Sequence, residues 1–357
     1  TEEQKDKWLE PLLKGEILGK RSSAEAVAWL TEFLKSEPRS KPARGALAQF
    51  YVDQKRLPEA RAIFEQLAAE EPDVREYRMG VAILSYQMKD YAAAEAQFGK
   101  LAASGDDGSA QLYLAQIAED QKRYDVALER YKLVTEGDRG WIAKLHVAAM
   151  YGKLGKVDEG RKWLADLPAV TIEQRIQVRQ AEASLLRESG DPQGAFALLE
   201  QGLKEHPDAP DLLYDSAMVA EKIDRVDVAE ARLKRLIELK PDDAQSLNAL
   251  GYTLVDRTPR VEEGRVLIEK ALKLSPDDPF ILDSMGWALY KLGRYDEAET
   301  YLRRALATRP DAEIAAHLGE VLWIKGEHDR AKEVWAAQLQ ASPDHPVLLE
   351  TVKRFTR

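Results

Sequence analysis

Proline returns at a nearly constant spacing through the second half of this chain. Pro207, Pro241, Pro276, Pro310 and Pro343 lie 34, 35, 34 and 33 residues apart in succession. A period of this length fits one pair of helices joined by a turn. Such pairs stack on their neighbours, so the chain can lengthen without a single large core. The period therefore favours an array that holds other molecules over a single catalytic domain.

The best-preserved repeat runs from Pro279 to Pro310. Small residues occupy the three positions where helix backbones approach closely, and large apolar residues occupy the positions that fill the space around them. The small residues are Gly286, Ala298 and Ala305, and the large ones are Met285, Leu289, Leu302 and Leu306. Gly293 and Tyr295 are predicted to form the turn between the helices, because glycine accepts a left-handed backbone there.

This pattern is typical of the tetratricopeptide (TPR) repeat. Other copies begin at Pro210, Ala244 and Ala312. Weaker copies extend toward the N-terminus, where Trp8 and Leu12 belong to the first predicted helix. The sequence predicts an all-α fold, a TPR superhelical solenoid of about ten helix-turn-helix repeats. A polar helix from Val347 to Phe355 is predicted to cap the apolar edge of the stack.

We expect one continuous solenoid with three parts. Divergent repeats cover residues 1–167, regular repeats cover 168–343, and the capping helix covers 344–357. Three irregular segments are predicted to be loops, namely Ser104–Ser109, Glu136–Gly140 and Asp166–Thr171. They are either ordinary junctions between repeats or hinges that set the curvature of the superhelix.

Composition and motifs exclude several classes of function. The formal net charge is −10, which argues against the basic face that nucleic acid or anionic lipid requires, so we expect no membrane contact from this segment. There is no cysteine for a disulfide or a zinc–thiolate site. The five histidines lack HExxH spacing, and no glycine-rich loop precedes a GK[ST] motif. We therefore expect no catalytic site, no cofactor and no metal.

One stripe of residues along the first helices of the repeats has the composition of a binding surface. Positions 2, 5, 9 and 12 of these helices lie three or four residues apart, so they share one face. Nine of these positions are candidates for a protein-binding groove: Tyr214, Met218, Asn248, Tyr252, Asp283, Trp287, Tyr290, Glu320 and Trp323. Aromatic and methionine side chains are enriched where proteins bind one another.

The alternative is that part of this stripe packs on the neighbouring repeat. If the groove interpretation holds, none of its residues is needed for packing between repeats. The substitutions Trp287→Ala and Tyr290→Ala should then weaken partner binding while leaving the helix content intact. Asn248 is expected to supply hydrogen bonds to the backbone of a bound segment.

Two blocks carry a resemblance that goes beyond a general TPR protein. They are Asp283–Trp287 (DSMGW) and Ala316–Trp323 (AHLGEVLW). On these blocks the chain resembles a proteobacterial family of TPR-repeat outer-membrane lipoproteins. The resemblance is closest to the branch of that family, in Pseudomonas, whose members are binding partners of a carboxy-terminal processing protease. It extends more loosely over the whole chain.

The resemblance implies a non-catalytic adaptor in the periplasm. Such an adaptor binds a carboxy-terminal processing serine protease and brings it substrates, among them peptidoglycan hydrolases. The family's lipidated cysteine, which anchors it to the outer membrane, is expected upstream of Thr1. A scaffold for another cell-envelope assembly complex is the alternative. An enzyme with a TPR array is a third possibility, which would need a catalytic domain outside these repeats.

Overall fold

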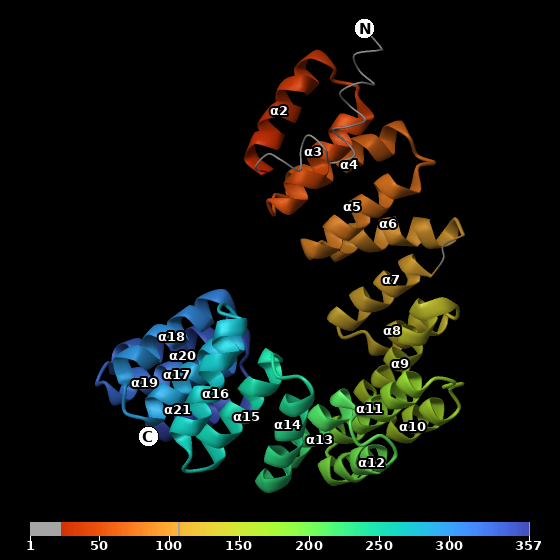
Figure 1. The fold of residues 1–357 in the computed structure, drawn as a ribbon. Helices are drawn as coiled ribbons and strands as arrows, with labels where there is room; N and C mark the ends of the chain where they lie inside the picture. Colours follow the sequence, from red (N-terminus) through yellow and green to blue (C-terminus); the bar gives the residue numbers. More distant parts are fainter. Residues whose placement is uncertain (1–22, 106–107, 357) are drawn as a thin grey trace. The chain divides into compact units, whose positions relative to one another are not determined.

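The computed structural model describes residues 23–105 and 108–356 of the chain. Within these ranges the chain forms twenty α-helices and no strand. This confirms the predicted all-α class (Figure 1). The first predicted helix, with Trp8 and Leu12, lies outside the described residues. The helix that follows it in the first repeat is α2 (Ser23–Ser36).

The helices divide between two compact units, one ending at Leu167 and the other beginning at Pro168. In the first unit they are α2, α3 (Lys41–Asp53), α4 (Leu57–Glu70), α5 (Arg75–Gln87), α6 (Tyr91–Ala103), α7 (Ser109–Asp120), α8 (Tyr124–Lys132), α9 (Gly137–Lys153) and α10 (Val157–Ala165). In the second they are α11 (Ile172–Glu188), α12 (Pro192–Glu205), α13 (Pro210–Lys222), α14 (Val226–Leu239), α15 (Ala244–Arg257), α16 (Val261–Leu274), α17 (Pro279–Lys291), α18 (Tyr295–Thr308), α19 (Ala312–Ile324), α20 (His328–Ala341) and α21 (Pro346–Phe355).

The periodic prolines end the second helix of each regular repeat, as the sequence predicted. Helices α12, α14, α16, α18 and α20 all stop two residues before one of them. Proline lacks the N–H that a continuing helix needs, so it fixes where the chain leaves the helix. The first helices of these repeats begin at Pro210, Ala244, Pro279 and Ala312, the positions expected from the sequence.

Turns within the repeats share one backbone geometry, although not one residue type. Glycine has a positive φ in four of them, at Gly155, Gly190, Gly293 and Gly326. Four others place a larger residue in the same region, with φ from 58 to 62°, at Lys55, Lys89, Lys122 and Asp224. The α15–α16 connection is an exception, because it carries an extra residue and extends at Thr258 (φ −140°, ψ 164°).

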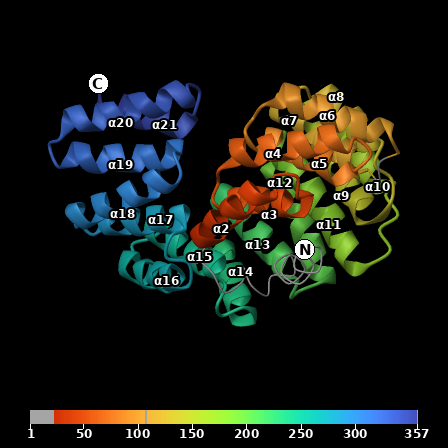
Figure 2. The same ribbon diagram turned by 90° about the horizontal axis from the view of Figure 1, so that it is seen from above.

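Small residues allow the two helices of a repeat to approach closely. The predicted positions Ala298 and Ala305 are fully buried, and so are Leu302 and Trp335 beside them. A Cβ added to Gly319 would lie 1.9 Å from Nε1 of Trp335, which leaves no room for any larger residue. Helices α17 to α21 build up the C-terminal end of the second unit in this way (Figures 1 and 2).

Two sequence-based boundaries differ from the structure. The segment Glu136–Gly140 was predicted to be a loop, but α9 begins at Gly137 and includes Gly140. Glycine is required at this helical position because an added Cβ would lie 2.5 Å from the carbonyl oxygen of Thr135. The capping helix, α21, begins one residue earlier than expected, at Pro346. Of the other predicted loops, Ser104–Ser109 lies partly outside the described residues.

Candidate protein-binding groove

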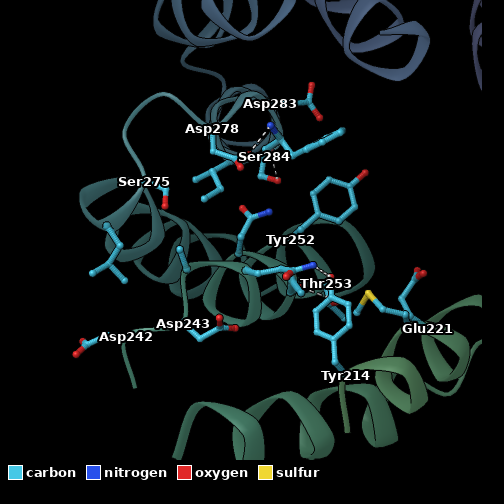
Figure 3. A pocket seen from close by; sticks show the side chains of 18 of the residues that line it. Tyr214, Glu221, Asp242, Asp243, Tyr252, Thr253, Ser275, Asp278, Asp283 and Ser284 are labelled. Carbon is cyan, nitrogen blue, oxygen red and sulfur yellow. Dashed lines mark hydrogen bonds between the residues drawn. The ribbon is translucent and has the colours of Figure 1, made fainter. Parts of the chain in front are cut away.

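The second unit contains an open pocket between the first helices of three consecutive repeats. Its cavity volume is about 900 Å³. We call it the α13–α17 pocket, because most of its lining comes from these two helices and from α15 between them (Figure 3). Its lining residues are Tyr214, Met218, Glu221, Asp242, Asp243, Ala244, Gln245, Asn248, Ala249, Tyr252, Thr253, Leu274, Ser275, Asp278, Phe280, Ile281, Asp283, Ser284 and Glu313.

Five of the nine predicted groove residues line this pocket. They are Tyr214, Met218, Asn248, Tyr252 and Asp283. The helical spacing of the stripe brings them together because α13, α15 and α17 present the same face in successive repeats. The structure therefore assembles the first part of the predicted stripe into one concave surface.

The polar groups of the pocket are fixed by its helices. Asp243 and Asp278 cap the starts of α15 and α17, and their carboxylates accept hydrogen bonds from the backbone N–H groups of Ser246 and Phe280 at 2.9 Å each. The amide of Gln245 donates to the hydroxyl of Tyr214 at 3.1 Å. These contacts hold the rim of the pocket in one conformation.

Asn248 does not take part in these hydrogen bonds. Its Oδ1 atom is buried and has no hydrogen-bond partner among the described residues. A buried oxygen without a donor costs free energy, on the order of 1–3 kcal/mol. A group that enters the pocket and donates a hydrogen bond would recover this energy, which fits the predicted role of Asn248.

The electrostatic environment of the pocket is acidic. Six of its lining residues carry carboxylates, and no lysine or arginine lines it. Burial raises the pKa of the Tyr252 phenol, and the carboxylates of Asp256, Glu313, Asp283 and Glu221 raise it further. In Figure 3, Tyr252 lies between Asp283 and Glu221. The electrostatic potential at the Tyr252 hydroxyl therefore favours a bound group with positive charge.

The other four predicted groove residues do not line the pocket. Trp287, Tyr290, Glu320 and Trp323 lie farther along the stack, on α17 and α19, in what we call the α17–α21 network. The Trp287 ring stacks on Tyr290 at 4.9 Å and on His317 at 4.2 Å between ring centroids. Its Nε1 atom donates to Asp256 at 3.0 Å. Trp287 is therefore part of the packing between repeats.

The other three residues of the network also contact neighbouring side chains. The Tyr290 hydroxyl donates to Glu320 at 2.8 Å, and Glu320, which is 6% exposed, is also paired with Arg354 of α21. Trp323 packs against Trp335 and Phe355, with ring centroids 5.8 and 6.1 Å away. The expectation that none of these positions takes part in packing is wrong for Trp287, Tyr290, Glu320 and Trp323. The capping helix and the neighbouring repeat cover them.

Sequence reasoning missed one ion pair that joins the two regions. Nδ1 of His317 lies 3.0 Å from Oδ1 of Asp283, and the two residues are 7% and 8% exposed. The residues are 34 apart, as are Glu320 and Arg354. Opposite charges separated by one repeat length were the signal that could have revealed both pairs.

Two features that would indicate other functions are missing from the described residues. Histidine and carboxylate side chains do not gather anywhere in groups of three or more that could hold a metal ion. No helix in residues 23–105 or 108–356 has the length and apolar character needed to cross a membrane.

Comparison with known proteins identifies the repeat family. The chain matches the tetratricopeptide repeat family over residues 20–84 and 186–251, and a second description of that family over 82–140 and 284–346. A TPR repeat-containing protein of Pseudomonas aeruginosa is 38% identical over 248 residues, which is 70% of this chain. The chain spans 42% of the length of that relative.

One solved structure shares the fold with a TM-score above 0.5. A tetratricopeptide repeat protein from Parabacteroides merdae matches 71% of this chain and 100% of its own, with a TM-score of 0.54 and 14% identity. A thermophilic TPR protein from Thermus thermophilus matches 50% of this chain and 96% of its own, with a TM-score of 0.46 and 25% identity. The family matches over residues 20–140, 186–251 and 284–346 show that the chain belongs to the tetratricopeptide repeat family and forms a scaffold for protein–protein interaction.

Proposed function

We propose that this chain is a non-catalytic adaptor that brings a carboxy-terminal processing serine protease together with its substrates. The proposed substrates are peptidoglycan hydrolases. The observation that carries the binding role is the α13–α17 pocket, whose buried Asn248 oxygen lacks a donor among the described residues. The choice of partners rests on the resemblance of the DSMGW and AHLGEVLW blocks to protease-binding lipoproteins.

A simple physical effect would allow such an adaptor to act without chemistry of its own. Two proteins held on one scaffold meet at a raised effective concentration, and their encounter becomes intramolecular. A repeat array offers separate surfaces for the two partners, since each repeat contacts only its neighbours. The protease would supply the nucleophile.

Reconstitution with purified proteins tests this proposal. The protease and one peptidoglycan hydrolase are incubated with and without the chain, and the loss of intact hydrolase is followed over time. We expect cleavage to be faster when the chain is present. Equal rates with and without the chain, under conditions where the protease cleaves a model peptide, would contradict the proposal. Binding of a different envelope protein instead would favour the scaffold of another assembly complex.

The proposed location is the periplasmic face of the outer membrane. It follows from the family resemblance, in which a lipidated N-terminus upstream of this segment provides the anchor. Fractionation of cells that produce the full-length protein tests it. We expect the protein in the outer-membrane fraction, and recovery with the cytoplasmic proteins would contradict this location.

A further inference from the structure

The lining of the α13–α17 pocket has unbalanced charge. Its six carboxylates belong to Glu221, Asp242, Asp243, Asp278, Asp283 and Glu313. Arg257 pairs with Glu221, and His317 pairs with Asp283. Within the described ranges, the other four carboxylates form no ion pair. A cation in the pocket would be attracted by these negative charges.

Apolar and aromatic surfaces lie beside these carboxylates. Phe280 is 47% exposed although it is a large aromatic residue, and Tyr252, Tyr214 and Met218 are partly buried in the lining. The stem of a lysine or arginine side chain can pack along such surfaces while its charged end reaches a carboxylate. Aromatic rings also attract a cation placed over their faces, and the guanidinium of Arg309 already lies over Phe280 in this way, 4.9 Å from the ring centroid.

The backbone of a bound segment has its own partner. The Oδ1 atom of Asn248 accepts no hydrogen bond in the described structure, and it belongs to the middle of the pocket lining on α15. An extended peptide exposes backbone N–H groups that are not used in a helix, so it can supply the missing donor. A free inorganic cation could also bind this oxygen, but within the described residues the carboxylates do not gather in a group of three or more that could hold a metal ion. A cavity of about 900 Å³ also exceeds what one ion fills, which favours a peptide.

We propose that the α13–α17 pocket binds an extended peptide segment that carries an arginine or lysine side chain. The cationic end lies beside Glu313 and the Tyr252 hydroxyl, and a backbone N–H of the segment donates to Asn248. The inference rests on the proposed function, because it names the kind of segment by which the adaptor holds a partner. The pocket should therefore select basic segments and reject acidic ones.

A pair of peptides that differ in one charge tests this inference. We would use fluorescein-labelled nonapeptides of sequence Gly-Ser-Ala-Leu-X-Leu-Ala-Ser-Gly, with blocked ends, in which X is arginine or its uncharged isostere citrulline. Fluorescence polarisation with the complete chain measures both affinities. The arginine peptide should bind at least about tenfold more tightly than the citrulline peptide, as expected for hydrogen bonds to a charged group. Equal affinities, or binding of neither peptide, would overturn the inference.

Three variants assign the contacts. Glu313→Gln should reduce the preference for arginine over citrulline by about two- to fivefold, because this carboxylate is exposed and partly screened. Glu333→Gln on α20 removes the same charge from an exposed site outside the pocket and should leave the preference unchanged. Asn248→Ala should weaken both peptides by the same factor, about three- to tenfold. Equal effects of Glu313→Gln and Glu333→Gln would overturn the placement of the cation.

The two proposals can fail separately. A preference for arginine without any effect of the chain on hydrolase cleavage would contradict the proposed adaptor function and leave this inference in place. Chain-dependent cleavage with equal binding of both peptides would overturn this inference and leave the proposed adaptor function in place.

Discussion

Asp283 joins the α13–α17 pocket to the packing between repeats. Its carboxylate lines the α13–α17 pocket, and it also lies 3.0 Å from Nδ1 of His317 in the next repeat. The His317 ring in turn stacks on Trp287 at 4.2 Å. One carboxylate therefore takes part both in the acidic lining and in the core of the second unit.

This ion pair makes the stability of the second unit depend on pH. Burial disfavours the charged form of His317, but the carboxylates of Asp283, Glu313 and Glu320 together outweigh burial and raise the pKa of the imidazole above its ordinary value. The folded state then holds the proton more tightly than the unfolded state. The stabilisation is complete below about pH 6.5 and is lost as the pH rises through the raised pKa.

Urea unfolding of the wild type and of His317→Gln at several pH values measures this effect. The wild type should lose stability between pH 6.5 and the raised pKa, whereas the variant should show a flatter dependence in that window. Parallel pH profiles for the two proteins would contradict the assignment to His317.

Trp287 and Phe280 are expected to separate stability from binding, although both are aromatic residues of α17. Trp287 is 8% exposed and belongs to the core, so Trp287→Ala should lower the free energy of unfolding by about 3–5 kcal/mol. Phe280 is 47% exposed in the pocket lining, so Phe280→Ala should weaken partner binding and change stability by less than about 1 kcal/mol.

Chemical denaturation and a binding titration of both variants provide the comparison. Leu349→Ala is the matched control, because this side chain is 44% exposed on α21, outside the pocket. A stable Trp287→Ala protein that fails to bind would restore the original interpretation of Trp287 as a groove residue.

Close packing of Gly319 predicts a large effect of a single methyl group. In Gly319→Ala the new Cβ would lie 1.9 Å from Nε1 of Trp335, so α19 and α20 must move apart. We expect a loss of about 1–3 kcal/mol in the free energy of unfolding. Gly99→Ala is the control, because nothing lies within 4 Å of its added Cβ, and it should stabilise α6. Equal stability of the two variants would contradict the packing.

The left-handed turn residues offer a stabilising substitution. Lys122 has a φ of 59°, in a region that costs a residue with a Cβ about 1–2 kcal/mol. Lys122→Gly should therefore raise the free energy of unfolding of the first unit by about 1 kcal/mol. The same change at Lys100, an exposed position within α6, should lower it by a similar amount. Thermal or urea unfolding of both variants distinguishes these results.

The repeat period predicted the helices well because proline and the small residues act locally. Pro276 and Pro310 each end the helix that precedes them, whatever surrounds that helix. Gly286 permits close contact between helices, whichever residues the neighbouring repeat contains. Lys122 could not be identified as a turn residue, since its type does not favour a positive φ. The position of its turn was nevertheless implied by the spacing of the neighbouring repeats.

The site was predicted only in part, because the face of a helix does not reveal what covers it. Tyr252 and Trp287 both occupy position 9 of their repeats, yet Tyr252 lines a pocket and Trp287 is enclosed. The difference arises from His317, which stacks on Trp287 from the next repeat. Trp323 is covered in a similar way by Phe355 of the capping helix. Such contacts depend on the sizes and charges of side chains one repeat away.

The concentration dependence of cleavage tests the adaptor account most directly. The rate at which the carboxy-terminal processing protease cleaves a peptidoglycan hydrolase is measured while the concentration of the chain is raised through and far above that of both partners. An adaptor that holds both proteins predicts a rate that rises, passes through a maximum and falls, because excess scaffold binds the partners on separate molecules. A rate that rises to a plateau, or that never changes, would contradict the account.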